Sequence, residues 1–219
     1  MKYSRSFLEI SKKALSRQLA LWRDELPFVR PFYAVKCNND AVLMRWMREI
    51  NPHMGFDCAS VREMHSALET QIRPADIIYA QPCKRREDCQ AAMKLGVTKT
   101  VVDSPEEVEK LGAVGWQGDV LVRLLVDDMA SRQPFGKKFG APLAWLPSIY
   151  ESAAKHGLHM SGFSFHVGSE CQSPLQYNAA IERCWDGVDI GKRWGYRCST
   201  IDIGGGFLPD AESFTPFFI

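Results

Sequence analysis

The sequence lacks the features that would direct it to a membrane or to nucleic acid. No apolar run approaches the roughly 20 residues that a membrane-spanning helix needs, and the first 15 residues carry charges where a secretory signal would be continuously apolar. The 27 basic and 26 acidic residues balance to +1 without a run of like charges. We therefore expect a soluble, cytoplasmic protein whose partner is a small molecule, with no nucleic acid and no membrane.

The sequence also lacks a C-x-x-C pair, and its seven cysteines are odd in number. Most of them stand beside predicted strands or helices, which is typical of reduced thiols in a cytosolic protein and argues against a structural zinc site. Cys58 has no base beside it in the sequence. We expect it to be a small buried hydrophobic residue rather than a nucleophile.

Short β-type runs alternate with helical patterns along the 219 residues, which suffice for one well-packed domain. The runs are too uniformly apolar for strands with one solvent face, so they predict parallel strands joined by helical crossovers. They lie at residues 31–36, 54–59, 77–80, 99–103, 120–126, 161–167 and 199–204.

The helices are predicted from apolar spacing and from start signals. The first is expected at residues 6–26, with Ser6 and Glu9 as a capping box. Later helices should begin at the following signals: Asp40, Ser60 with Glu63, Ser104 with Pro105, and Ser173 with Pro174.

Seven strands are one fewer than a closed (β/α)₈ barrel requires. The chain is therefore either an open, doubly wound sheet or a barrel that stops one strand short. Residues 207–219 carry two prolines and several phenylalanines but neither a clear helix nor another strand. We favour the second interpretation, an α/β fold of the TIM-like (β/α)₈ barrel type, truncated before the eighth strand.

Polar residues fall where the predicted strands end. Parallel strands bring their carboxyl ends to one face, where barrel enzymes build active sites, whereas unrelated structural residues would be scattered over both ends. The residues are Lys36, Asp57, Arg123 within its strand, His166, and the triplet Gly204, Gly205 and Gly206. The pattern predicts an active site.

Lys36 ends the run "PFYAVK", which should be buried, although lysine is rarely buried. A partly desolvated ammonium in a pocket has a depressed pKa and can attack a carbonyl to form a Schiff base. The ordinary alternative is a solvated lysine at the start of a loop. The other polar residues at the strand ends favour the first interpretation.

Other site residues have both a functional and a structural interpretation. His166 stands three residues before Ser169, so an imidazole could lie against a flat ring while a hydroxyl donates to a phosphate, but it could also be a core histidine. The glycine triplet could admit a phosphate or form a tight turn. Asp57 could pair with Lys36 or approach a helix, and Glu63 can complete a capping box.

Six motifs in order and spacing resemble those of eukaryotic-type ornithine decarboxylases: "PFYAVKCN", "GFDCAS", "IIYAQPCK", "KKFGA", "FSFHVGS" and "DIGGGF". These enzymes belong to the group IV decarboxylases that use pyridoxal 5'-phosphate on an alanine-racemase-like barrel. The resemblance runs from about residue 7 to about residue 208.

The resemblance implies a role for each site residue. Lys36 matches the lysine that holds pyridoxal phosphate covalently, and His166 matches the histidine stacked on its ring. The remaining matches are Ser169 and Gly206, with the neighbouring Gly204 and Gly205, at the phosphate; Asp57, Glu63 and Arg123 around the lysine and ring; and Lys138 near the family's dimer interface.

The chain also departs from the family. The resemblance calls for an eighth strand with an E-P-G-R motif and a C-terminal β domain that binds the substrate's distal amine, and neither is present in the sequence. Residues 1–219 are thus expected to form the pyridoxal-phosphate-binding barrel domain, incomplete and without that β domain.

The expected function is pyridoxal-phosphate-dependent decarboxylation of a basic amino acid, with ornithine to putrescine in polyamine biosynthesis as the first choice. The family form would be a homodimer, and this chain alone is expected to be inactive. Lysine, arginine and diaminopimelate stay open as substrates. Two other functions stay open, a non-catalytic regulator of the antizyme-inhibitor type and a stand-alone pyridoxal-phosphate-binding barrel.

Overall fold

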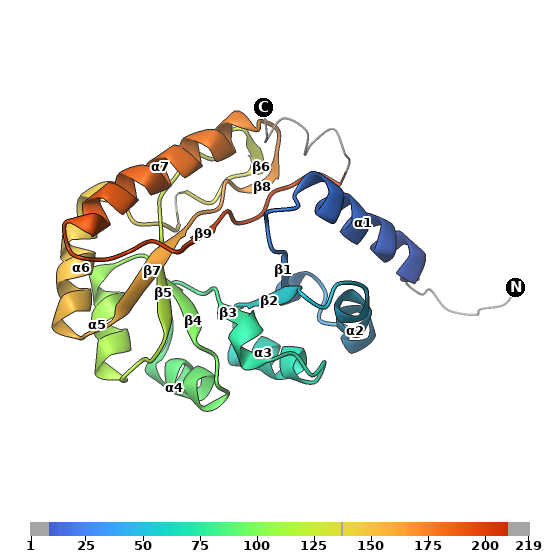
Figure 1. Cartoon of the computed structure of the whole chain (residues 1–219), viewed down its shortest axis with the longest axis horizontal. Coiled ribbons are helices and arrows are strands. Elements are labelled where there is room, and N and C mark those ends of the chain that lie inside the picture. Colours follow the sequence, from blue (N-terminus) through green and yellow to red (C-terminus); the bar gives the residue numbers. More distant parts are fainter. Residues whose placement is uncertain (1–8, 137, 210–219) are drawn as a thin grey trace, which may run out of the picture.

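The computed structural model of the chain describes residues 9–136 and 138–209. Helix α1 (Lys12–Glu25) comes first, and parallel strands then alternate with helices (Figure 1). The strands of the main sheet are β1 (Phe32–Ala34), β2 (Gly55–Cys58), β3 (Ile77–Tyr79), β4 (Lys99–Val102), β5 (Asp119–Arg123), β7 (His159–Ser164) and β9 (Thr200–Asp202). The later helices are α2 (Ala41–Ile50), α3 (Val61–Leu68), α4 (Arg86–Lys94), α5 (Pro105–Ala113), α6 (Leu146–Lys155) and α7 (Leu175–Lys192).

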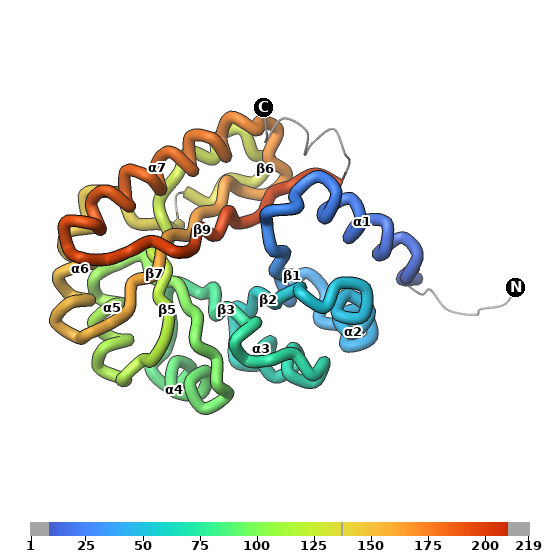
Figure 2. Tube along the Cα trace, in the orientation of Figure 1, coloured from blue at the N-terminus to red at the C-terminus, as the bar shows by residue number. Residues whose placement is uncertain are grey.

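Within residues 9–136 and 138–209, the main sheet has seven strands in the order β1-β2-β3-β4-β5-β7-β9, and every pair is parallel. Each strand thus pairs with the next strand of that sheet along the chain, so the order never reverses as it does in a doubly wound sheet. The strands form a curled wall with the helices on its outer side (Figure 2). The predicted (β/α)₈ barrel type, with one strand fewer than a closed barrel, is confirmed.

The strands from β2 to β7 are mostly buried on both faces, as parallel strands require, whereas the outer strands β1 and β9 are more exposed. Ile78, Val101 and Leu121 come from three neighbouring strands and pack together on one face. Their neighbours in sequence, such as Tyr79 and Val102, point to the other face and join the large core under the helices. Alternation along each strand therefore supplies both layers of the barrel wall.

The predicted start signals of α2, α3 and α5 are confirmed. The Asp40 carboxylate accepts the N–H groups of Val42 and Leu43 at 2.9 and 2.8 Å. Ser60 and Ser104 cap their helices in the same manner. In contrast, α7 begins after Pro174 with no side-chain cap.

The start of the first helix was predicted wrongly. Helix α1 begins at Lys12, because the Ser11 hydroxyl accepts the N–H of Ala14 at 3.2 Å and so caps the helix there. Glu9 precedes the helix without helical structure. Ser6, the other member of the predicted capping box, lies outside the described residues. None of the helices in the described ranges is long and apolar enough to cross a membrane.

A two-stranded antiparallel ribbon, β6 (Ser131–Gln133) with β8 (Ser169–Cys171), was not predicted. Its strands are three residues long and largely polar, so they carry no hydrophobic periodicity that would reveal them. The ribbon follows the carboxyl ends of β5 and β7 in the chain, which places it beside the predicted site.

Candidate active site

The carboxyl ends of the strands bring the predicted polar residues into one electrostatic cluster. Asp57 on β2 pairs in register with Ala34, two residues before Lys36. The charges of Lys36 and Arg123 both act on the Asp57 carboxyl, and the same two cations act on His166. The structure thus brings these four predicted residues within electrostatic reach of one another, whereas their roles stay a proposal.

Lys36 itself is placed differently from the prediction. Strand β1 ends at Ala34, and the 3₁₀ turn Val35–Cys37 follows. Val35 is fully buried, but Lys36 is exposed, so the expectation of a lysine inside a buried run is wrong. Within the described ranges its Nζ makes no hydrogen bond and no ion pair, so its amine is free to meet a ligand.

Asp57 is a carboxyl with an unfavourable environment for its anion. Burial raises its pKa to about 6, and the charges of Asp202 and Glu63 act in the same direction. Lys36 and Arg123 oppose this rise but do not cancel it. Within the described ranges, the expected pairing of Asp57 with Lys36 is an electrostatic attraction without an ion pair.

His166 is held as a neutral ring. Burial, followed by the positive charges of Arg123 and Lys36, lowers its pKa to about 4. Its Nδ1 lies 3.0 Å from the backbone N of Gly168 and accepts that N–H, so the ring proton belongs on Nε2, on the side of Gly205. A flat, uncharged imidazole is suited to stacking against another ring.

Arg123 is the cation at the centre of the cluster. It ends β5, is partly buried, and its guanidinium lies 4.7 Å from the centroid of the Phe139 ring. Burial lowers its pKa, while the carboxylates of Asp103, Asp202 and Asp57 raise it. One partly desolvated cation thus interacts electrostatically with three carboxylates.

Glu63 has the structural role that the sequence allows. Its backbone N–H is accepted by the Ser60 hydroxyl at 3.3 Å, and its carboxylate accepts the N–H of Ala59 at 2.8 Å. The capping box is therefore shifted by one residue, because the carboxylate bonds Ala59 and not Ser60. From this position the charge of Glu63 still contributes to the raised pKa of Asp57.

The glycine triplet wraps around the backbone that follows His166. Gly204 and Gly206 have φ angles of 69° and 101°, and a Cβ on them would lie 2.2 Å from Phe165 O and 2.3 Å from Gly168 O. Two of the three glycines are thus required by the chain's own packing. A Cβ on Gly205 would lie 3.2 Å from His166 Nε2.

This wrapped segment also presents unused hydrogen-bond donors. Cys171 N donates to Gly206 O at 2.9 Å, which joins the glycines to the segment that holds Ser169. Among the described residues, the N–H groups of Gly205 and Gly206 and the Ser169 hydroxyl donate to no protein acceptor. Such a group of donors fits an anion such as a phosphate.

Asp202 belongs to the cluster and was missed. It ends β9, where the Ser164 hydroxyl donates to it at 3.1 Å and Gly204 N donates at 2.9 Å. Burial raises its pKa. The rule that located Lys36 and Asp57, a polar residue at the end of a buried strand, applies equally to the Asp in "DIGGG" and could have found it.

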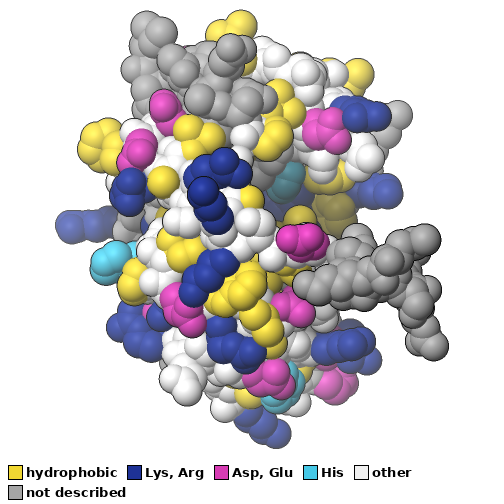
Figure 3. Space-filling view, turned by 90° about the vertical axis from the view of Figure 1, so that its right-hand side faces the viewer, with side chains coloured by type: hydrophobic (Ala, Val, Ile, Leu, Met, Phe, Trp, Pro, Cys, Tyr) yellow, Lys and Arg dark blue, Asp and Glu magenta, His cyan; other side chains and the backbone are white. Residues whose placement is uncertain are grey.

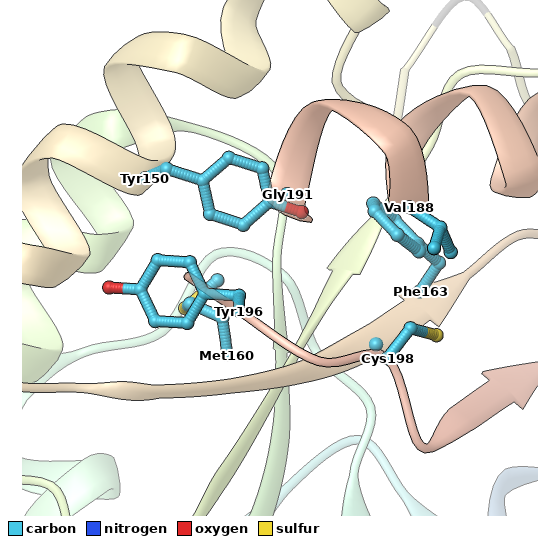
Figure 4. A pocket seen from close by; sticks show the side chains of 8 residues that line it. Tyr150, Met160, Phe163, Val188, Gly191, Tyr196 and Cys198 are labelled. Atoms are coloured by element: carbon cyan, nitrogen blue, oxygen red, sulfur yellow. The ribbon is translucent and has the colours of Figure 1, made fainter. Parts of the chain in front are cut away.

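Two hollows lie away from this cluster. One, of about 10 Å³, lies between β7, α6 and α7, where the stacked rings of Tyr150 and Tyr196 are 5.1 Å apart (Figure 4). The other, of about 700 Å³, lies between α1 and the loops at the amino ends of the strands, beside Phe28 and Arg73. The first is too small for a ligand, and the second lies at the amino ends of the strands, away from Lys36, Asp57 and His166.

The described residues contain no group of three or more His, Cys, Asp or Glu side chains that could hold a metal ion. All seven cysteines are free thiols, and Cys58 is fully buried, as predicted for a small hydrophobic residue. Over the face of α1 and α2, basic side chains are interspersed with acidic and hydrophobic ones (Figure 3).

A barrel wall with a lysine, a neutral histidine and a glycine-rich loop at the carboxyl ends of its strands defines a class, the barrel proteins that hold a carbonyl cofactor. Residues 12–216 match the family model of the pyridoxal binding domain of pyridoxal-dependent decarboxylases. The chain belongs to this family, and the predicted family is confirmed. The predicted cofactor, pyridoxal 5'-phosphate, agrees with the family's description.

Among curated proteins, the chain is 37% identical to ornithine decarboxylase of Caenorhabditis elegans over 213 residues, which are 97% of this chain and 50% of that protein. It is 37% identical to ornithine decarboxylase of Leishmania donovani over 192 residues, 87% of this chain and 27% of that protein. The chain spans half or less of the length of these relatives.

Solved structures of the same type superimpose closely. The arginine decarboxylase of Paramecium bursaria Chlorella virus has a TM-score of 0.88 at 30% identity, with 94% of this chain and 57% of that chain covered. Lysine decarboxylase from Selenomonas ruminantium has a TM-score of 0.84 at 29% identity, with 94% and 56% covered. Both neighbours contain a larger chain than the barrel wall described here.

Proposed function

We propose that the chain is the pyridoxal-phosphate-binding barrel of a decarboxylase that acts on a basic amino acid. The observation that carries the proposal is the convergence, at one end of the sheet, of an unpaired lysine, a neutral histidine and a group of unused donors. Packing and helix capping explain why Gly204, Gly206 and Glu63 occupy their positions. They do not explain the side chains of Lys36 and Ser169.

Each group has a definite task in this proposal. The Lys36 Nζ amine would hold the cofactor covalently through its carbonyl group. The uncharged His166 ring stacks on the cofactor ring. The Ser169 hydroxyl and the N–H groups of Gly205 and Gly206 hold the phosphate. Bound pyridoxal phosphate supplies an electron sink for cleavage at the substrate's α carbon.

The acidic residues control charge around the lysine and the ring. With a pKa of about 6, Asp57 can hold or release a proton near neutral pH, which lets it respond to a cation that enters beside it. Arg123 offsets the negative charge of Asp57 and Asp202. We infer that these residues line the cofactor without bonding its phosphate.

Ornithine is the first substrate to test, because relatives named ornithine decarboxylase are 33–37% identical to this chain. The solved neighbours include arginine, lysine and ornithine decarboxylases at 28–31% identity, so they do not favour one amino acid. The same proposal includes putrescine as the product and polyamine synthesis in the cytoplasm as the process. It also includes a homodimer whose interface lies near the exposed Lys138.

Cofactor capture provides the direct test. The purified chain is mixed with pyridoxal phosphate, its absorbance is recorded near the visible, and the complex is reduced with borohydride and mapped by mass spectrometry. We expect a band that reduction removes and a label on Lys36. Lys36→Ala should abolish both, while Lys155→Ala, which removes an exposed lysine of α6, should change neither.

Turnover is measured separately, as CO₂ released from labelled ornithine, lysine and arginine. Ornithine should be preferred wherever release is detected. A chain that shows no Lys36-dependent band would contradict the proposal and would favour the non-catalytic regulator.

A further inference from the structure

His166 is approached by a turn that the mechanism above does not use. The turn runs from Asp128 to Gly136, and the Asp128 carboxylate is buried, with the residue 6% exposed. One of its oxygens accepts the N–H of Phe135 and also that of Gly136, the latter at 2.6 Å. Its backbone carbonyl accepts the N–H of Ser131 at 3.1 Å. One buried aspartate thus fixes both ends of the turn, through its backbone carbonyl near the start and its carboxylate at the end.

The turn places an aromatic ring against the imidazole. The ring centroids of Phe135 and His166 are 5.0 Å apart, and the ring planes meet at 66°, an edge-to-face arrangement. Such contacts contribute beyond the burial of apolar area, and they depend on the orientation of both rings. A turn with a different shape would therefore leave His166 with less support.

Strand β6 lies within this turn, and its pairing with β8 joins the turn to the segment that carries His166. The Ser131 hydroxyl donates to Val167 O, and Gln172 N donates to Ala130 O at 3.0 Å. A Cβ on Gly168 would lie 2.7 Å from Gln133 O, so the two segments are in close contact. The N–H of this same Gly168 is accepted by the imidazole.

The charged groups around the ring come from three parts of the chain. Arg123 on β5 and Lys36 after β1 disfavour a positive imidazole, whereas Asp128 favours it. Burial and the two cations prevail, so the ring stays neutral. The principal effect of Asp128 is therefore on geometry and not on protonation.

We propose that Asp128 is a positioning residue for His166: it holds the turn that keeps Phe135 against the imidazole, and so fixes the ring that faces pyridoxal phosphate. The inference rests on the proposed function for its ligand. Its mechanical part concerns only the chain's own residues, since neither Asp128 nor Phe135 needs to touch the cofactor.

The test combines nuclear magnetic resonance of the histidine ring with cofactor affinity. The full chain is labelled with ¹⁵N-histidine, and the His166 signals are assigned by their loss in His166→Asn. The ¹⁵N shifts of the cofactor-free chain report whether Nδ1 still accepts the Gly168 N–H. Affinity for pyridoxal phosphate is then measured by absorbance titration.

We expect Phe135→Leu to mix the two ring tautomers of His166 and to weaken pyridoxal phosphate binding about threefold to tenfold. Phe135→Tyr, which keeps the ring, should restore both. Asp128→Ala should resemble Phe135→Leu. The matched controls are Phe28→Leu, at a phenylalanine that is 91% exposed, and Asp127→Asn, at the exposed neighbour of Asp128.

Unchanged His166 signals in a folded Phe135→Leu variant would overturn the inference, as would unchanged affinity for pyridoxal phosphate. If Asp128→Ala fails to fold, the Phe135 pair still decides. Failure of the proposed function is distinguishable, because it removes the Lys36-dependent band from the unmodified chain while the histidine signals still report on the turn.

Discussion

The carboxyl groups at the two ends of the sheet lie in opposite electrostatic environments, which shift their pKa values in opposite directions. At the amino ends, Asp76 before β3 is paired with Arg30 at 2.6 Å and with Arg73 at 2.7 Å. The hydrogen bond from Arg73 and the charge and hydrogen bond of Arg30 lower its pKa to about 2 despite partial desolvation. At the carboxyl ends, Asp57 has no ion-pair partner among the described residues, and burial raises its pKa to about 6.

The difference shows which end stabilises the fold and which is prepared for a ligand. A carboxylate in closed ion pairs favours the folded state. A carboxylate held in a partly desolvated cluster destabilises the folded state. Such groups are found mainly at functional sites. Altering one end of the sheet at a time in the cofactor-free chain tests this contrast.

The largest effect is expected from Arg123→Met. This change removes the cation that serves Asp57 and Asp202, and at pH 8 we expect the free energy of unfolding to fall by about 3 kcal/mol, because the remaining buried charges lose their compensation. Near pH 5 the Asp57 carboxyl is mostly protonated and needs no cation, so the loss should shrink. Urea unfolding at the two pH values measures it.

The control for this variant is Arg132→Met, which removes an exposed arginine paired with Glu170 at 3.1 Å. It should change stability by less than about 0.5 kcal/mol. Equal losses at pH 8 and pH 5 for Arg123→Met would show that Arg123 acts by packing and not through the carboxylates.

The carboxyl end could be predicted from sequence because one rule located it. A polar residue at the end of a buried run identified Lys36, Asp57 and His166, and the same rule covers Asp202. The exposure of Lys36 could not be predicted, since it depends on β1 ending two residues earlier than the predicted strand at residues 31–36. The parallel direction of the strands followed from the strand–helix alternation, whereas their order along the sheet did not, because the alternation also fits a doubly wound sheet.

The amino end and the ribbon gave no such signal. Arg30, Arg73 and Asp76 belong to loops whose meeting depends on the packed fold, and surface arginines and aspartates are common everywhere. Strands β6 and β8 are too short and polar to show a period of two. The Phe135 contact with His166 depends on that ribbon and was hidden for the same reason.

The second effect has the opposite sign, because Asp57→Asn should stabilise the chain. The folded pKa of about 6 lies above the ordinary 3.8, so ionisation penalises the folded state fully above pH 6 and not at all below pH 3.8. We expect a gain of about 2 kcal/mol at pH 8 and none at pH 4. Denaturant titration at both pH values tests it, and a gain of equal size at pH 4 would refute the charge argument.

The third effect belongs to the amino ends. Asp76→Asn should lower the free energy of unfolding by about 1–2 kcal/mol at pH 7, because two arginines lose a charged acceptor. The folded pKa of about 2 lies below 3.8, so this stabilisation is full above pH 4 and declines as the pH falls toward 2. Between pH 4 and pH 3, the unmodified chain should therefore lose stability faster than the variant.

Asp24→Asn is the matched control, since Asp24 pairs with Arg23 at 2.9 Å on the surface of α1. It should leave the pH dependence unaltered. Parallel stability curves for Asp76→Asn and the unmodified chain between pH 4 and pH 3 would mean that the carboxylate of Asp76 is not held in its low-pKa state.

The smallest effect is expected at an exposed ion pair at the amino end. It tests whether burial of the carboxylate or its position determines how strongly an ion pair stabilises the fold. Asp119 and His159 start neighbouring strands at the amino end and lie 2.9 Å apart, but their side chains are 37% and 68% exposed. Solvent screens an exposed pair, so Asp119→Asn should cost only about 0.3 kcal/mol. A double-mutant cycle with His159→Gln should give a similarly small coupling. Added 0.5 M salt should remove most of it. A coupling as large as the Asp76 effect would mean that position at the amino end, rather than burial of the carboxylate, determines how strongly an ion pair stabilises this fold.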